Sequence, residues 1–136
     1  MLVRVKSDAS FKSERHTVGL GAQIVANKEA HDFALRVKAG CLKTSVKAEI
    51  QACIYALHQV IDNFGVDEFV MYMSDNSSVI HLLTQMLEED YETDDKQLLH
   101  LKKVLAQFKH IEVKWIPRKD NKACDRLSKL VRKKIK

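Results

Sequence analysis

Five consecutive apolar residues, Phe69 to Met73, end abruptly in the small polar stretch Ser74 to Ser78, which contains Asp75. An apolar run of this length that stops at turn-forming residues is typical of a strand buried within a sheet. A helical pattern of apolar residues follows directly, at Val79, Leu82, Leu83 and Met86. The run therefore predicts a buried strand that leads into a helix and leaves Asp75 at the sheet edge, where ligands of open α/β sheets bind.

The first forty residues predict three antiparallel strands. Residues 2–8 alternate between apolar and polar side chains, and Asp8-Ala9-Ser10 is expected to end this strand. Residues 17–27 and 30–38 suit two more strands joined by a short turn near Asn27. Gly19 and Gly21 lie within the second of these and indicate a bulge or a close approach of another backbone.

The remaining segments alternate between helix and strand. A long helix is expected over residues 44–62, with Gly65 just beyond its end, and another over 95–109. Residues 111–115 alternate again and stop at Pro117, and Asp120-Asn121 offers caps for a terminal helix. The apolar stripe of that helix is expected at Cys124, Leu127, Leu130 or Val131, and Ile135. The order β-β-β-α-β-α-α-β-α predicts one α/β domain, residues 1–136, with a mixed sheet and helices on its faces.

Composition places the chain among ordinary globular domains. It has 136 residues, of which 46% are hydrophobic and 30% charged, enough for one core. No segment reaches the ~20 apolar residues of a membrane span, and the N-terminus lacks the pattern of a signal peptide. A soluble, cytoplasmic protein is therefore expected. The three cysteines are widely spaced, which indicates reduced core residues and argues against a structural zinc site.

Charge is distributed unevenly along the chain. Residues 88–95 contain six acids and no base, so the rest of the chain is +11 although the net charge is only +5. Residues 129–136 contain five cations, a density that attracts phosphate backbones. The same cations are equally consistent with a solvated helix face that only aids solubility.

Four carboxylates fall at junctions between predicted elements. Asp8 is near the end of the first strand, Glu49 is on the inner stripe of the long helix, Asp75 ends the buried strand, and Asp125 begins the last helix. Unpaired buried carboxylates destabilise a fold, so their convergence makes sense if a hard cation such as Mg²⁺ or Mn²⁺ neutralises them. Two such ions about 4 Å apart activate water and stabilise a leaving oxygen, which is nuclease chemistry. The alternative is that each acid is merely exposed, capping or salt-bridged.

Four motifs, in this order and on these elements, resemble the ribonuclease H family, specifically ribonuclease HI. They are Ser-Asp-Ala-Ser at 7–10, Lys-Ala-Glu-Ile-Gln-Ala at 47–52, Met-Ser-Asp-Asn at 73–76, and Trp-Ile-Pro-Arg-Lys-Asp-Asn-Lys-Ala-Cys-Asp-Arg-Leu-Ser at 115–128. The resemblance implies a three-layer α/β/α fold with a five-stranded mixed sheet. It also implies an endonuclease that cuts the RNA strand of RNA/DNA hybrids with two divalent ions, Mg²⁺ or Mn²⁺.

The resemblance assigns roles to individual residues. Asp8, Glu49, Asp75 and Asp125 are implied as catalytic metal ligands, with Asp8 and Asp75 near both ions, Glu49 at the ion beside the nucleophilic water, and Asp125 at the second ion. Thr44 matches a position that contacts a DNA phosphate, and Ser45 replaces an asparagine near a 2′-hydroxyl. Ser10 and Asn76 flank catalytic positions and are expected to contact the sugar-phosphate backbone, unless they serve as caps or turn residues.

Two features depart from the family pattern. Several ribonuclease HI enzymes have a mobile histidine in the loop before the last aspartate, whereas residues 117–121 contain none. Arg118 or Lys119 is expected near the scissile phosphate instead, in a slower enzyme, because neither exchanges protons near neutral pH as histidine does. The region between the middle helices is acidic, not basic, so hybrid binding is expected to rely on the last helix and on Lys43, Lys47, Arg118, Lys119 and Lys122.

Three interpretations remain open from the sequence. The leading one is a monomeric ribonuclease that acts on RNA/DNA hybrids. The second is a non-catalytic module that binds nucleic acid, or a basic protein partner through residues 88–95. The third is a nuclease of the same fold with another substrate, such as double-stranded RNA.

Overall fold

A computed structural model describes residues 1–12, 16–40 and 44–133. The strands are β1 (Leu2–Lys12), β2 (Thr17–Ala26), β3 (Glu29–Lys38), β4 (Phe69–Ser74) and β5 (His110–Trp115). The helices are α1 (Ser45–Phe64), α2 (Ser77–Glu88), α3 (Lys96–Gln107) and α4 (Lys122–Lys133), and a short 3₁₀ turn, η2 (Arg118–Asn121), precedes α4. The order of strands and α-helices predicted from the sequence is confirmed. Within the described residues no helix has the length and apolar character needed to cross a membrane.

The five strands form one mixed sheet in the order β3-β2-β1-β4-β5. β1 lies at its centre, antiparallel to β2 and parallel to β4. Lys6 of β1 pairs with Met73 of β4, and extending this register by two residues brings Asp8 beside Asp75. The register of the two parallel strands therefore places two of the predicted carboxylates together.

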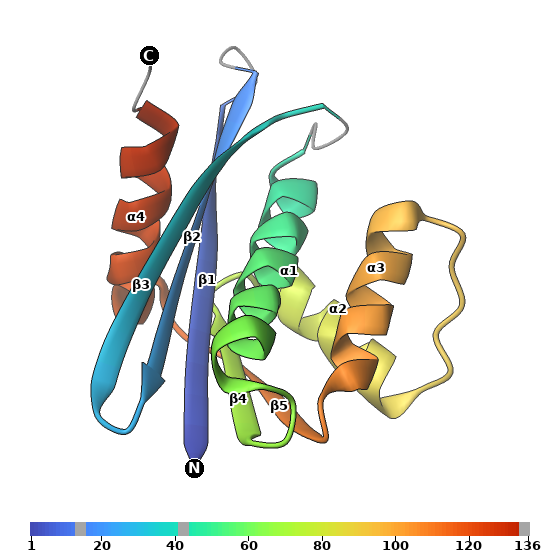
Figure 1. Ribbon diagram of the computed structural model, residues 1–136. Helices are drawn as coiled ribbons and strands as arrows, with labels where there is room; N and C mark the ends of the chain where they lie inside the picture. The colour runs from blue at the N-terminus through green and yellow to red at the C-terminus, as the bar shows by residue number, and fades with distance from the viewer. Residues whose placement is uncertain (13–15, 41–43, 134–136) are drawn as a thin grey trace.

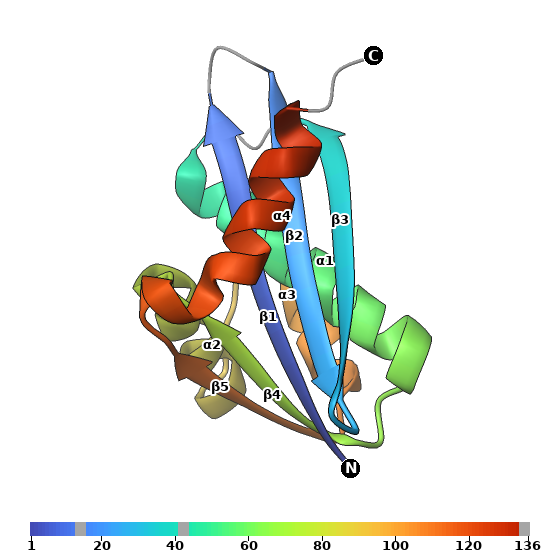
Figure 2. The same ribbon diagram turned by 90° about the vertical axis from the view of Figure 1, so that its left-hand side faces the viewer.

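The sheet lies between two helical layers (Figure 1). α1, α2 and α3 cover one face, where Val3 and Val5 of β1 pack in a buried core with Ile54 and Leu57 of α1. α4 lies against β1 and β2 on the other face, as the turned view shows (Figure 2). The three-layer α/β/α fold is thus the one expected from the sequence.

β2 presents a different surface to each layer. Val18, Leu20 and Ala22 are buried on the α1 side, whereas Gly19 and Gly21 meet the backbone of α4. A Cβ atom at Gly19 would lie 1.9 Å from the carbonyl oxygen of Ser128, and one at Gly21 would lie 2.5 Å from that of Cys124. The prediction of a close backbone approach at these glycines is confirmed.

Several predicted boundaries differ from those of the structure. β1 does not end at Asp8 but continues to Lys12, because residues 8–12 pair with β2 from Gly21 back to Thr17. Asp120-Asn121 does not cap α4 directly, since both residues belong to η2. Of the apolar stripe expected on α4, Cys124 is buried, Leu127 and Val131 are half-buried and Leu130 is 66% exposed, whereas Ile135 lies outside the described residues. Ser128 and Arg132 complete the buried side of the helix.

Candidate active site

Three carboxylates from three different elements meet where β4 ends beside the central strand β1. Asp8 lies within β1, Asp75 directly follows β4, and Glu49 lies on α1. One oxygen from each carboxylate is within 4.8 Å of the other two. The predicted convergence of Asp8, Glu49 and Asp75 is therefore present in the fold.

Hydrogen bonds to the main chain fix the orientation of these groups. The Ala9 N–H donates to Asp8 Oδ1 at 3.0 Å and to Glu49 Oε1 at 2.9 Å, so one amide holds both carboxylates. The Trp115 Nε1–H donates to the Asp75 carbonyl oxygen at 3.1 Å and ties the end of β5 to the turn after β4. The Asp8 and Glu49 carboxylates are thus held beside each other, and the backbone that carries Asp75 is tied to β5.

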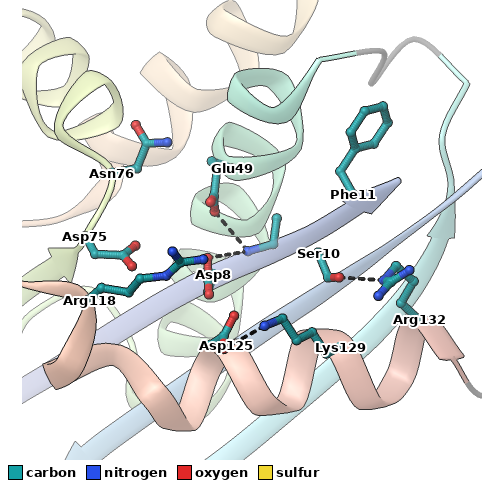
Figure 3. A pocket seen from close by; sticks show the side chains of 11 residues that line it. Asp8, Ser10, Phe11, Glu49, Asp75, Asn76, Arg118, Asp125, Lys129 and Arg132 are labelled. Carbon is teal, nitrogen blue, oxygen red and sulfur yellow. Dashed lines mark hydrogen bonds and ion pairs between the residues drawn. The ribbon is translucent and has the colours of Figure 1, made fainter. Parts of the chain in front are cut away.

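Asp125 enters the same cleft from α4, on the other side of the sheet. The cleft has a volume of about 440 Å³ and is lined by all four predicted carboxylates (Figure 3). Asp125 differs from the other three because its Oδ2 forms an ion pair with Lys129 Nζ at 3.2 Å. It is not part of the group whose oxygens lie within 4.8 Å of one another.

Crowding and burial change the acidity of two of these groups. Burial raises the pKa of Asp8, and the nearby charges of Asp75 and Asp125 act in the same direction against its hydrogen bonds. Burial, the charge of Asp8 and a hydrogen bond to Asp8 raise the pKa of Glu49 to about 9. Glu49 therefore retains its proton at neutral pH when no cation is bound.

The donor set fits a hard divalent cation. Carboxylate oxygens from three side chains are the ligands preferred by Mg²⁺ and Mn²⁺. A divalent cation would replace the proton that Glu49 retains and offset the repulsion that raises its pKa. Asp8, Glu49 and Asp75 are thus the residues that would hold such an ion.

We expect Glu49→Gln to stabilise the metal-free protein at alkaline pH. The folded protein binds the Glu49 proton more tightly than the unfolded chain, so the unfolding free energy of the wild type falls as pH rises from 4.5 to about 9. Glutamine carries no charge and removes this dependence. The gain at pH 8 is roughly 1–2 kcal/mol, or about 4 °C in Tm per kcal/mol.

Thermal unfolding in EDTA between pH 5 and 9 measures this effect. The exposed Glu112 on β5 offers a matched control, and we expect Glu112→Gln to keep the slope of the wild type. Equal slopes for Glu49→Gln and wild type would show that the site does not hold a strained carboxylate. Added Mg²⁺ should raise the Tm of the wild type more than that of Glu49→Gln.

The predicted nucleic-acid-binding residues fall into two groups. Ser10, Asn76 and Arg118 line the cleft, and Arg118 points its side chain toward Asp75 and Asp8 (Figure 3). Asn76 is also the N-cap of α2, where its side chain accepts a hydrogen bond from Val79 N at 3.0 Å.

Thr44, Ser45 and Lys119 are exposed and do not line the cleft. Thr44 caps α1 by accepting from Lys47 N at 3.2 Å, so the capping alternative considered for such residues applies to it. Lys43 lies outside the described residues.

Three further side chains line the cleft: Phe11, which sequence reasoning missed, and Lys129 and Arg132, which it included only as part of the cationic stretch 129–136. Phe11 follows Ser10 on the part of β1 that lies beyond the predicted end of the first strand. Lys129 and Arg132 follow Asp125 by four and seven residues on α4, which places them on the same helix face. That spacing was the signal that could have identified both.

The acidic segment 88–95 is separate from this cleft. It spans the end of α2 and the loop that leads to α3, and none of its residues lines the cleft. Asp95 caps α3 by accepting from Leu98 N at 3.0 Å, and Lys102 Nζ donates to the Tyr91 carbonyl oxygen. Part of the segment therefore has a structural role in starting α3.

Comparisons with known proteins agree with this architecture. The ribonuclease H1 of the halophilic archaeon Halobacterium salinarum superposes with a TM-score of 0.70 at 18% identity, covering 96% of this chain and 97% of that chain. The N-terminal ribonuclease H domain of a Mycobacterium tuberculosis protein gives 0.68 at 20% identity, covering 96% and 93%. A ribonuclease H1 isolated from compost, solved in complex with an RNA/DNA hybrid, gives 0.75 at 18% identity, covering 94% of each chain.

Sequence comparison gives the family. No curated protein sequence matches this one significantly. A family model described as reverse transcriptase-like matches residues 6–131, which include all four acidic residues of the cleft. The chain therefore belongs to the reverse transcriptase-like family and has the ribonuclease H fold, which confirms the family resemblance of its sequence.

Proposed function

We propose that the protein is a metal-dependent endoribonuclease that cleaves the RNA strand of RNA/DNA hybrids. The observation that carries the proposal is the group of Asp8, Glu49 and Asp75, whose carboxylate oxygens lie within 4.8 Å of one another on a ribonuclease H fold. The bound hybrid of the structurally similar compost enzyme supports the choice of substrate.

Asp8, Glu49 and Asp75 are the proposed ligands, and Asp125 completes the set from α4. Two divalent cations, Mg²⁺ or Mn²⁺, would supply an activated water and neutralise charge on the phosphodiester. The Ala9 amide keeps Asp8 and Glu49 in place without a side-chain rearrangement. Asp125 becomes available for this role when Lys129 turns from it toward an incoming phosphate.

Arg118 and Asn76 are the proposed substrate contacts beside Asp75. The guanidinium of Arg118 offers several donors to a phosphate or ribose oxygen in the cleft. The side-chain oxygen of Asn76 is occupied by the α2 cap, which leaves its NH₂ group for the substrate. Neither residue reads base edges, so recognition rests on backbone shape and 2′-hydroxyls.

A substrate panel tests this function. We expect cleavage of an RNA/DNA hybrid in Mg²⁺ or Mn²⁺, with slower or no cleavage of double-stranded RNA, single-stranded RNA and DNA. EDTA should abolish cleavage. Faster cleavage of double-stranded RNA would reassign the substrate, and binding of the hybrid without turnover would indicate a non-catalytic module instead.

A further inference from the structure

Arg132 is a buried cation at one end of the cleft. It lies near the end of α4 and is only 5% exposed. Its Nε–H donates to Ser10 Oγ on β1 (Figure 3). Both residues line the same cleft as the carboxylates, so the charge is buried in the protein yet borders the proposed substrate space.

No acidic partner accounts for this charge in the described ranges 1–12, 16–40 and 44–133. The ion pairs recorded there are Met1 with Glu68 and Lys129 with Asp125. A guanidinium has five N–H donors, and the Ser10 hydroxyl accepts one of them. In the described residues none of the other guanidinium nitrogens is both buried and unpaired, so these donors are open to the cleft that Arg132 lines, where an anion can reach them.

The position of Ser10 indicates what kind of anion fits. Ser10 follows Asp8 by two residues on β1, a distance of about 7 Å along a strand. One nucleotide of a sugar-phosphate backbone covers a distance of this order. A strand whose reacting phosphate lies at Asp8 would thus present an adjacent phosphate to Ser10 and Arg132.

The other cations of the cleft have different surroundings. Lys129 is half exposed and paired with Asp125. Arg118 lies at the opposite side of the carboxylates, beside Asp75 (Figure 3). Arg132 is therefore the buried cation on the Ser10 side of the cleft. Its planar guanidinium suits bidentate hydrogen bonding to a phosphate.

We propose that Arg132 and Ser10 form a subsite for a phosphate group next to the carboxylate cluster. In the enzyme this subsite holds a backbone phosphate adjacent to the one cleaved, a reading that rests on the proposed nuclease function. The same chemistry would accept a free phosphate ion. Arg132 is thereby a substrate-binding residue and not only a contact between α4 and β1.

Two measurements on Arg132→Gln test the subsite. The first is the Kd for an RNA/DNA hybrid in EDTA over a series of salt concentrations. We expect about tenfold weaker binding and a salt slope smaller by about one, because one phosphate contact is lost. The second is the rise in Tm that inorganic phosphate produces in the wild type, which Arg132→Gln should lose.

Arg126→Gln is the matched control. Arg126 is exposed on the same helix and does not line the cleft, so this variant removes the same charge without touching the subsite. We expect its hybrid Kd to stay within about twofold of the wild type. Equal behaviour of Arg132→Gln and Arg126→Gln in both measurements would overturn the proposal.

The two measurements separate this proposal from the nuclease function. If the wild type binds no hybrid but phosphate raises its Tm through Arg132, the subsite stands and the nuclease function fails. If Arg132→Gln does not fold, Ser10→Ala tests the same subsite by removing the hydroxyl that holds the guanidinium. Hybrid binding about threefold weaker supports the proposal, and unchanged binding overturns it.

Discussion

Asp8→Asn should lower the rate of hybrid cleavage on the order of 10³-fold or more, because it removes one ligand of a proposed metal site. Asp8 offers a carboxylate oxygen that lies within 4.8 Å of those of Glu49 and Asp75. An asparagine keeps the oxygen that accepts the Ala9 N–H, so the local backbone should remain in place. Initial rates of hybrid cleavage under single-turnover conditions measure the loss.

The folded state of Asp8→Asn should survive the change. Burial raises the pKa of Asp8 to about 6. The ionised carboxylate therefore lowers the free energy of unfolding of the wild type at neutral pH. The metal-free variant should therefore be at least as stable as the wild type, whereas its Tm should respond less to Mg²⁺. Circular dichroism and thermal unfolding distinguish this outcome from a loss of activity through unfolding.

Asp120→Asn is the control for a charge change near the site. Asp120 is exposed in η2 and does not line the cleft, so its removal should leave the rate within about twofold of the wild type. Asp75→Asn should resemble Asp8→Asn. Asp125→Asn should lower the rate of hybrid cleavage less than Asp8→Asn does, since Asp125 is paired with Lys129 and lies outside the closely spaced group. Cleavage that persists in both Asp8→Asn and Asp75→Asn would refute the assignment of the site.

Gly19→Ala should destabilise the protein by roughly 3 kcal/mol, the upper end of the range for an overpacked core contact. The added Cβ would lie 1.9 Å from the carbonyl oxygen of Ser128. This oxygen belongs to the backbone of α4, so no side-chain rotation relieves the clash. The helix must move away from β2, and Asp125 moves with it.

Chemical denaturation of three glycine variants measures this effect. Gly21→Ala should lower the free energy of unfolding somewhat less than Gly19→Ala, because the added Cβ would lie 2.5 Å from its nearest atom, the Cys124 carbonyl oxygen. Gly65→Ala is the control: its φ of 82° disfavours alanine, but no atom lies within 4 Å, so about 1 kcal/mol is expected. A Gly19→Ala variant no less stable than Gly65→Ala would contradict the close packing of α4.

The parts of the fold that follow from local patterns were predictable. The apolar run at 69–73 gave β4, and the stop after it placed Asp75 at the sheet edge. The spacing of apolar residues gave α1, and Gly65 terminates it as expected, with its N–H donating to Val60 and Ile61 carbonyl oxygens. These features depend on residues near one another in sequence, where periodicity and capping are informative.

Features set by long-range contacts were not predictable. Asp8-Ala9-Ser10 has the composition of a turn but is strand, because β2 supplies its hydrogen-bonding partner. On α4 the apolar pattern left Leu130 and Val131 as alternatives for the inner stripe, yet Leu130 is exposed and the charged Arg132 is buried. Arg132 is buried because Gly19 lets the helix approach the sheet beside Ser10, a circumstance that no local pattern reveals.

The site was predictable where its residues occupy unusual positions in helices and strands that the sequence pattern reveals. Asp75 and Glu49 stood out because carboxylates are unusual at the end of an apolar strand and on the inner side of a helix. Asp125 has a different environment because Lys129, four residues later on α4, forms an ion pair with it, and this spacing was readable from the sequence. The separation of Thr44 and Ser45 from the cleft depends on where the start of α1 lies relative to the sheet, which local patterns do not specify.

Because α4 packs against Gly19 and Gly21, its inner and outer sides can be substituted independently of each other. The inner side packs through the main-chain atoms of α4 against the two glycines. Substitutions on the rest of the helix should therefore leave the distance between α4 and the sheet unchanged. The outer side carries Arg126 and the exposed Leu130. Substitutions at these outer positions should therefore change the surface charge and solubility of the protein while the carboxylates keep their spacing.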